Sequence, residues 1–323
     1  MARPSTSSTA ARVKPAARRN ALPGRLSPGM VCDTAFRIIA RRHLAAVRAQ
    51  HDGTCRGDPE ALHQIRIALT HLRTAIRFFS PMVDDALRPE VWTELKWLNS
   101  QLGVVRDLDV AIERVIAESG GELTVIAELQ HWDEKRAEGH RQLARALQSG
   151  RYRRLVAQTS AWIESGPWST RRSKEAIRLR RCTLAGHATA KLTEWEKTLL
   201  KKARTLRKLD VEKRHKLRLL NKRLTYSIES LEDLFADESL TKQQSILKQL
   251  RKAQKSLGRL NDDARGQTLA ASLNEAVPEA GIRFLNRKRE KKLLRTASRA
   301  YRKLDKAKPF RSADLAPNAE PED

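Results

Sequence analysis

Apolar and polar residues recur along most of the chain with the period of an α-helix. Between residues 62 and 79, leucine and isoleucine return at spacings of three and four, so they fall on one side of a helical wheel. The same spacing returns over residues 215–231. We find no convincing alternation of apolar and polar residues, and breakers such as Gly166-Pro167 fall between the periodic segments. These patterns predict an all-α fold.

The order of motifs in the first half of the chain returns in the second half. Each half contains a His-x-x-Arg element, followed by a Leu-Gly element that ends in an aspartate. The elements are residues 63–66 and 102–107 in the first half, and residues 215–218 and 257–262 in the second half. This repetition predicts two tandem four-helix bundles related by internal pseudo-symmetry, with repeats at about 29–165 and 168–311.

Rows of basic residues border the apolar side of the predicted helices. A row beside the core is typical of side chains that line a groove or pore, whereas a purely solvating face would lie opposite the core. Cations one helical turn apart suit the phosphates of a polyanion, because arginine offers a forked pair of donors and lysine a point charge. An exposed face held by salt bridges is the alternative. The rows are His63, Arg66, Arg73 and Arg77; His215, Arg218 and Lys222; and Lys248, Arg251 and Lys255.

Positive charge is concentrated in the second half. The chain of 323 residues has 64 basic and 38 acidic residues, a net charge of +26. Residues 31–165 carry a net +1 and residues 166–311 a net +23, which indicates an anionic partner without identifying it. Residues 1–28 read as a disordered basic arm, or alternatively a transit peptide, and residues 312–323 as a disordered acidic tail. A hydrophobic content of 40% argues against a mostly disordered chain, and the absence of a long apolar run argues against a membrane span.

The candidate chemistry is sparse. Cys32, Cys55 and Cys182 are odd in number and widely spaced, which favours a reducing compartment, and we expect the cytoplasm. Cys182 and His187 form an isolated pair with nothing to complete a metal site. The sequence also lacks a nucleophile with a partner base and a glycine-rich phosphate loop. We therefore expect no catalytic residues, no metal and no cofactor.

The series of motifs resembles the CHAD domain family. It comprises HQIRIALTHLRTAIRFF at 63–79, LKWLNSQLGVVRDLDV at 95–110, HKLRLLNKRLTYSIE at 215–229 and LGRLND at 257–262. The resemblance implies a domain over about 29–311, built of paired four-helix bundles whose basic inner surfaces bind inorganic polyphosphate, with association to polyphosphate granules. It also implies binding roles for Lys96 and Arg106. Thr70 and Thr225 stand where the family pattern usually has a basic residue.

The first hypothesis is thus non-catalytic polyphosphate binding through the basic rows. The alternative is a nucleic-acid-binding basic helical protein, since the same charge serves any phosphate backbone. No aromatic stacking platform or reading helix supports that alternative in the sequence. An enzyme acting on polyphosphate and a helical adaptor are the remaining hypotheses.

Overall fold

The computed structural model describes residues 24–119, 123–235, 237–273 and 287–307. Apart from one isolated bridge between Val31 and Thr183, the regular secondary structure of these residues is helical. The predicted all-α fold is therefore confirmed. The predicted acidic tail and the predicted basic arm, except residues 24–28, lie outside the described residues.

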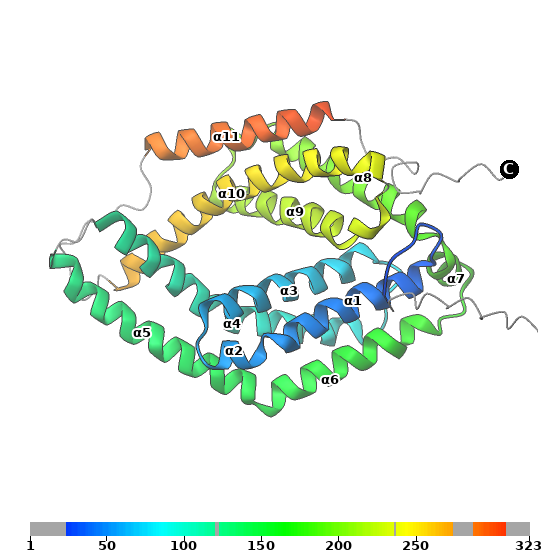
Figure 1. Ribbon diagram of the computed structural model, residues 1–323, viewed down its shortest axis with the longest axis horizontal. Coiled ribbons are helices and arrows are strands. Elements are labelled where there is room, and N and C mark those ends of the chain that lie inside the picture. The colour runs from blue at the N-terminus through cyan, green and yellow to red at the C-terminus, as the bar shows by residue number, and fades with distance from the viewer. Residues whose placement is uncertain (1–23, 120–122, 236, 274–286, 308–323) are drawn as a thin grey trace, which may run out of the picture.

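The two halves of the chain form two layers of helices (Figure 1). The first half contains α1 (Cys32–Ala49), α2 (His51–Cys55), α3 (Pro59–Phe78), α4 (Arg88–Ser119), α5 (Leu123–Gln148) and α6 (Gly150–Ser165). The second half contains α7 (Lys174–Arg181), α8 (Leu184–Ala203), α9 (Val211–Ser230), α10 (Asp237–Leu273) and α11 (Arg287–Lys306). Single 3₁₀ turns follow α6, α8 and α9, at η1 (Pro167–Ser169), η2 (Leu206–Lys208) and η3 (Glu232–Leu234).

The two helices that carry the His-x-x-Arg elements begin in the same way. Asp58 caps α3 by accepting a hydrogen bond from the backbone of Glu60, and Asp210 caps α9 by accepting one from Lys213. An aspartate at this position satisfies backbone donors that the first turn leaves without partners. His63 and His215 each lie five residues after their cap, so the two rows of basic residues start at the same helical position.

The apolar side of the helical wheel forms the core. Leu62, Ile65, Leu69, Leu72 and Ile76 of α3 are each no more than 1% exposed and face the neighbouring helices. α3 packs against α1 and α4, and α10 packs against α9 and α11. The predicted apolar rows are thus the faces that hold each layer together.

The two halves differ in the arrangement of their helices. α8, α9, α10 and α11 pack as a four-helix arrangement. In the first half, the short α2 follows α1, and α5 and α6 follow each other with a sharp change of direction at Ser149 (Figure 1). The Ser149 side chain caps α6, which fixes that change of direction. The internal pseudo-symmetry of the two halves stays a prediction.

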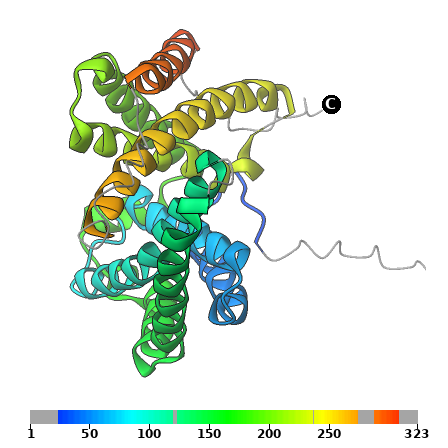
Figure 2. The same cartoon turned by 90° about the vertical axis from the view of Figure 1, so that its left-hand side faces the viewer.

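Four helices from both halves form a closed ring of contacts. α3 packs against α4 and α9, and α10 packs against α9 and α4. Figure 1 shows α9 and α10 opposite α3 and α4, and the view in Figure 2 shows α10 crossing obliquely from the second-half layer towards the first. The ring places helices that carry basic rows in both halves next to each other.

A stack of three aromatic rings joins the halves where α3 meets α9. The His71 ring lies between His43, at 4.6 Å between ring centroids, and Tyr226, at 4.3 Å. The Ser230 hydroxyl lies 3.1 Å from His43 Nε2 and 3.1 Å from His71 Nδ1. Burial lowers the pKa of His43 to about 3 and that of His71 to about 4, so both rings are neutral at pH 7.

The stack makes stability dependent on pH. Because the two histidines have a pKa near 6.5 when unfolded, the unfolded chain binds more protons below that pH. The stabilisation is fully present above pH 6.5 and decreases as the pH falls towards about 4, by up to about 1.4 kcal/mol per pH unit for each histidine. We expect urea denaturation to show this loss between pH 7 and pH 5.

To isolate the contribution of the two histidines, we compare the pH dependence of the wild-type protein with that of the double variant His43→Gln/His71→Gln. Burial raises the pKa of Glu196 to about 7, and this carboxyl group acts in the opposite direction over the same range. The free energy of unfolding should fall less steeply with decreasing pH in the variant than in the wild type. Equal slopes in the two proteins would contradict the assignment.

Candidate functional site

Positive charges from three helices gather around His63 near the start of α3. Partial burial lowers the pKa of His63, and the positive charges of Arg106, Arg66 and Lys222 lower it further. These cations belong to α4, α3 and α9 respectively. The structure therefore brings a predicted residue of the second half, Lys222, to predicted residues of the first half.

Each His-x-x-Arg arginine lies over the glycine of the Leu-Gly element in its own half. Arg66 Nη1 donates to the carbonyl oxygen of Leu102 at 2.8 Å, and it lies 3.6 Å from the place that a β-carbon on Gly103 would take. Arg218 Nε lies 3.9 Å from the corresponding place on Gly258. At both positions a β-carbon would be in van der Waals contact with the guanidinium. The His-x-x-Arg and Leu-Gly elements are therefore neighbours in space in both halves.

The other second-half residues of the row are oriented by their neighbours. His215 Nδ1 lies 2.7 Å from Asn261 Oδ1, an acceptor on α10, so the tautomer protonated on Nδ1 fits this contact. Lys222 Nζ lies 6.0 Å from the centre of the Tyr226 ring. Asn261, the residue just before the aspartate of the motif, is a partner that sequence reasoning does not identify.

Three other arginines gather around Arg77 further along α3, and Arg77 and one of them lie over a tryptophan ring. Arg73 and Arg77 both lie over the Trp92 ring, at 5.0 and 4.4 Å from its centre. Burial lowers the pKa of Arg77 to about 10, and the nearby charges of Arg223, Arg73 and Arg88 add to the effect. We call Arg73, Arg77, Arg88, Arg223 and Trp92 the arginine–tryptophan cluster. Asp84 compensates the charge of Arg88 through an ion pair. Arg223 lies 5.7 Å from the centre of a different ring, that of Trp195. The remaining guanidinium charges give the cluster a positive potential that favours an anion.

Sequence reasoning passes over three members of this cluster. Arg223 stands next to Lys222, one position outside the predicted row, and Arg88 begins the following helix. Trp92 is a single aromatic residue without a repeating pattern. Arg73 and Arg77 are four residues apart, so they are neighbours on one helix face, but this spacing does not show that they share an aromatic partner.

The row on α10 and Lys96 of α4 are exposed, whereas Arg106 of α4 is partly buried. Lys248, Arg251 and Lys255 are exposed on one side of α10. Arg251 forms an ion pair with Glu229 of α9 at 2.7 Å, as the alternative of a salt-bridged face expects. On α4, Lys96 is exposed, and the described contacts do not connect it to the other predicted residues. Arg106 lies 3.4 Å from Glu113 on its own helix.

The two threonines that depart from the family pattern are bonded to their own helices. Thr70 Oγ1 donates to the carbonyl oxygen of Arg66 at 2.7 Å, and Thr225 Oγ1 to that of Asn221 at 2.9 Å. Thr225 is 1% exposed. Position 225 is therefore a core position in this protein, where a charged side chain would have to be buried.

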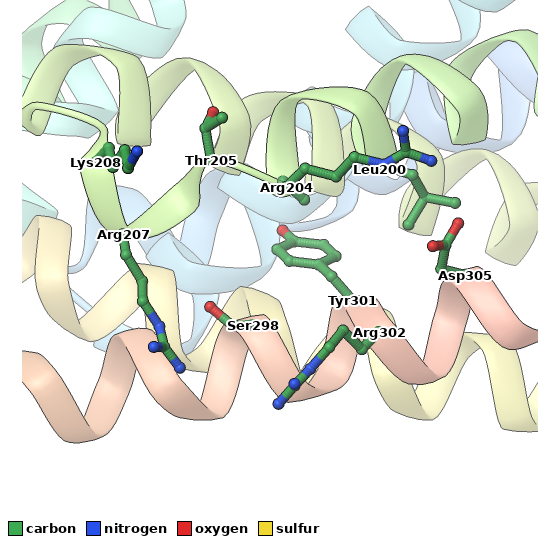
Figure 3. A pocket seen from close by; sticks show the side chains of 10 residues that line it. Leu200, Arg204, Thr205, Arg207, Lys208, Ser298, Tyr301, Arg302 and Asp305 are labelled. Atoms are coloured by element: carbon green, nitrogen blue, oxygen red, sulfur yellow. The ribbon is translucent and has the colours of Figure 1, made fainter.

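A pocket of about 430 Å³ lies between the end of α8, η2 and α11 (Figure 3). Tyr301 lies in the middle of it and donates its hydroxyl hydrogen to Asn221 Oδ1 at 3.1 Å. The predicted site residues do not line this pocket. Its lining includes the cations Arg204, Arg207, Lys208 and Arg302 and the carboxylate Asp305.

One group of side chains with metal-binding chemistry stands within the described residues. The sequence treats Cys182 and His187 as an isolated pair, but Cys32 of α1 lies beside them, with its sulfur 3.4 Å from that of Cys182. The predicted isolation of this pair was therefore wrong. The distance along the chain hides the contact, since 150 residues separate the two cysteines.

Within the described residues, no helix is both long and apolar enough to cross a membrane.

Comparisons with known proteins agree with the predicted family. No curated protein matches the chain. The chain is similar to the crystal structure of the CHAD domain from the plant Ricinus communis, with a TM-score of 0.72 and 24% sequence identity. That match covers 88% of this chain and 95% of the plant chain, and at this identity it shows the fold.

A family model provides the assignment. The CHAD domain model matches residues 38–271, which is well over half of the chain. The match includes both His-x-x-Arg elements and both Leu-Gly elements. The resemblance read from the motifs is thus confirmed: the chain belongs to the CHAD domain family, whose α-helical binding domains are associated in general with polyphosphate.

Proposed function

We propose that this protein binds inorganic polyphosphate, without turning it over, along the basic faces of α3, α9 and α10. The observation that carries the proposal is the gathering of Arg66, Arg106 and Lys222 around His63. Cations from both halves converge there, which a set of independently solvated surfaces would not require. The association of the family with polyphosphate supports polyphosphate as the polyanion, because charge alone fits any phosphate chain.

The row on α3 suits an extended ligand. From His63 to Arg77 it covers 14 residues, or about 21 Å of helix at 1.5 Å per residue. The two ends of this row are each joined by cations of α9, Lys222 near His63 and Arg223 near Arg77. A linear polyanion lying along α3 would therefore meet cations of α9 near both ends of the row.

The side chains of the arginine–tryptophan cluster are held before a ligand arrives. Contact with the Trp92 ring restricts Arg73 and Arg77, so less conformational entropy is lost when each binds a phosphate. The pKa of Arg77 is lowered mainly by burial and further by repulsion from Arg223, Arg73 and Arg88. A bound polyanion would relieve that repulsion, which favours binding.

We propose that the protein binds polyphosphate without catalysis, because the histidine that could act as a base, His71, is too weak a base at pH 7. Ser230, His71 and Glu229 lie in a row, with His71 Nε2 3.7 Å from Glu229 Oε2, and so superficially match a nucleophile, a base and an orienting acid. However, Ser230 and His71 are buried, and the pKa of His71 is about 4. A base so weak accepts a proton poorly at pH 7. We assign these residues to the packing of α3 on α9.

The free cysteines and the proposed ligand together suggest a cellular location. Free cysteines favour the cytoplasm, and we propose that polyphosphate binding there brings the protein to polyphosphate granules. Nucleic acid is the competing ligand for the same basic faces.

Removal of charge from either half should weaken polyphosphate binding. We compare the double variants Arg66→Gln/Arg77→Gln and Arg218→Gln/Lys222→Gln by titration with long-chain polyphosphate. Each should bind at least about tenfold more weakly, because a charge-assisted hydrogen bond contributes about 1.5 kcal/mol or more. The slope of log affinity against log salt should fall by about 0.7 for each phosphate that the variant no longer neutralises.

The matched control removes the same charge elsewhere. Arg141 and Arg145 are exposed on α5, where both pair with Glu138. The variant Arg141→Gln/Arg145→Gln should keep wild-type affinity and salt slope. If it loses as much affinity as the other two variants, net charge alone governs binding and the proposed surface is wrong.

Trp92 should matter for binding as well as for stability. Trp92→Leu removes the aromatic face under Arg73 and Arg77, while Trp97→Leu on the same helix removes the face under Arg151, whose guanidinium lies 4.3 Å from that ring. Urea denaturation should show a decrease in stability of about 0.5–1 kcal/mol for each cation–π pair removed, beyond the effect of the smaller buried area. Only Trp92→Leu should also weaken polyphosphate binding, and an equal effect of Trp97→Leu would remove the cluster from the site.

Competition separates polyphosphate from nucleic acid. At physiological salt, polyphosphate should displace single-stranded DNA and RNA of equal phosphate number from the protein. The displaced nucleic acids should show no base preference, because backbone contacts carry no sequence information. Strong DNA or RNA binding together with weak polyphosphate binding would favour the alternative function.

A further inference from the structure

Three side chains of types that can coordinate a metal ion meet where the first half of the chain joins the second. Cys32 stands at the start of α1, Cys182 directly follows α7, and His187 lies in the first turn of α8. Their ligand atoms all lie within 4.8 Å of one another. Figure 1 shows α7 beside the start of α1, at the end of the molecule where both halves are in contact.

The backbone fixes the positions of the two cysteines. The Cys32 amide donates to the carbonyl oxygen of Cys182 at 3.0 Å, and the Leu184 amide donates to that of Met30 at 2.7 Å. Val31 and Thr183 form an antiparallel bridge between these two hydrogen bonds. The sulfur atoms are thus held close together by contacts that do not depend on the sulfurs themselves, as a preformed ligand pair requires.

The histidine is oriented by its surroundings. His187 Nε2 lies 2.9 Å from the carbonyl oxygen of Phe78, which can only accept, so Nε2 carries the hydrogen. The Phe79 ring stacks on the imidazole, with 5.4 Å between centroids and 7° between planes. In the neutral ring this leaves the lone pair on Nδ1. A histidine whose second nitrogen donates to a carbonyl is typical of metal sites.

We propose that Cys32, Cys182 and His187 form a binding site for a zinc-like divalent cation. Two thiolates balance the charge of the ion, and the imidazole supplies a neutral third ligand. A tetrahedral ion with Zn–S bonds of about 2.3 Å places two sulfurs about 3.8 Å apart. The sulfurs here are 3.4 Å apart, so they would have to move apart by only about 0.4 Å to accommodate the ion.

Binding exchanges protons for the metal. The two S–H bonds break, the two protons go to solvent, and two S–metal bonds form with no change in oxidation state. Cys182 is half-buried, which gives the ion a route from solvent and leaves the fourth position to a water molecule. The ion would tie α1 to the segment between α7 and α8, and so would join the two halves beyond their packing contacts.

Cobalt(II) is the probe for this site. The full-length protein is reduced, stripped of metal with a chelator and titrated with Co²⁺. We expect one Co²⁺ per chain, with sulfur-to-cobalt charge-transfer absorption and the visible bands of tetrahedral cobalt, both removed by an equivalent of Zn²⁺. Zn²⁺ should also raise the melting temperature of the wild-type protein, because the metal binds the folded chain.

Variants identify the ligands. Cys182→Ser is the main test, because this side chain is only half-buried and its replacement leaves the core packing intact. It should abolish both the thiolate–cobalt absorption and the Zn²⁺-dependent rise in melting temperature. His187→Ala should weaken Co²⁺ binding and alter the visible bands.

Cys55→Ser is the matched control. Cys55 Sγ lies 3.8 Å from His51 Nε2 but belongs to no group of three ligands among the described residues, so this variant should behave as wild type. Absence of thiolate–cobalt bands in the reduced wild-type protein would overturn the proposal, as would bands that survive Cys182→Ser. It would also be overturned if the isolated protein held a Cys32–Cys182 disulfide and bound no Co²⁺ after reduction.

Discussion

The packing of α3 against α9 is the contact on which the rest of the structure depends. It brings two rows of positive charge from opposite halves of the chain close together, against their mutual repulsion. Neutral aromatic packing stabilises that contact: His43, His71 and Tyr226 stack at the place where the helices meet. Because burial keeps the two histidines uncharged, the contact adds no further positive charge to a basic region.

The remaining charges near this contact are compensated in different ways. Arg66 donates to the carbonyl oxygen of Leu102, and Arg251 pairs with Glu229. In the arginine–tryptophan cluster the aromatic face of Trp92 takes the place of a carboxylate. An aromatic partner stabilises a cation without cancelling its charge, so the cluster keeps a positive potential for an external anion. The fold thus holds its cations in position and leaves part of their charge uncompensated.

The second junction between the halves lies at the start of α1. Short backbone hydrogen bonds connect Cys32 to Cys182 and Met30 to Leu184, and His187 packs on Phe79 beside them. The halves are therefore in contact at the α3–α9 crossing, at this end and through α4 and α10. The contacts α3–α9 and α4–α10 close the ring of four helices, and the junction at the start of α1 joins the halves a third time.

The all-α fold, the family and the basic rows could be predicted from the amino-acid pattern alone. The spacing of Leu62, Ile65 and Leu69 sets a helical face, and any side chain beside that face must lie at the edge of the core, so the positions of His63 and Arg66 were predictable. Which rows meet depends on the packing of whole helices. That packing added Arg223 and Trp92 to the site, left Lys96 apart from it, and placed Cys32 beside Cys182. Helical periodicity is a local property of a few turns, whereas a contact between residues 150 positions apart depends on how helices cross, which no local spacing records.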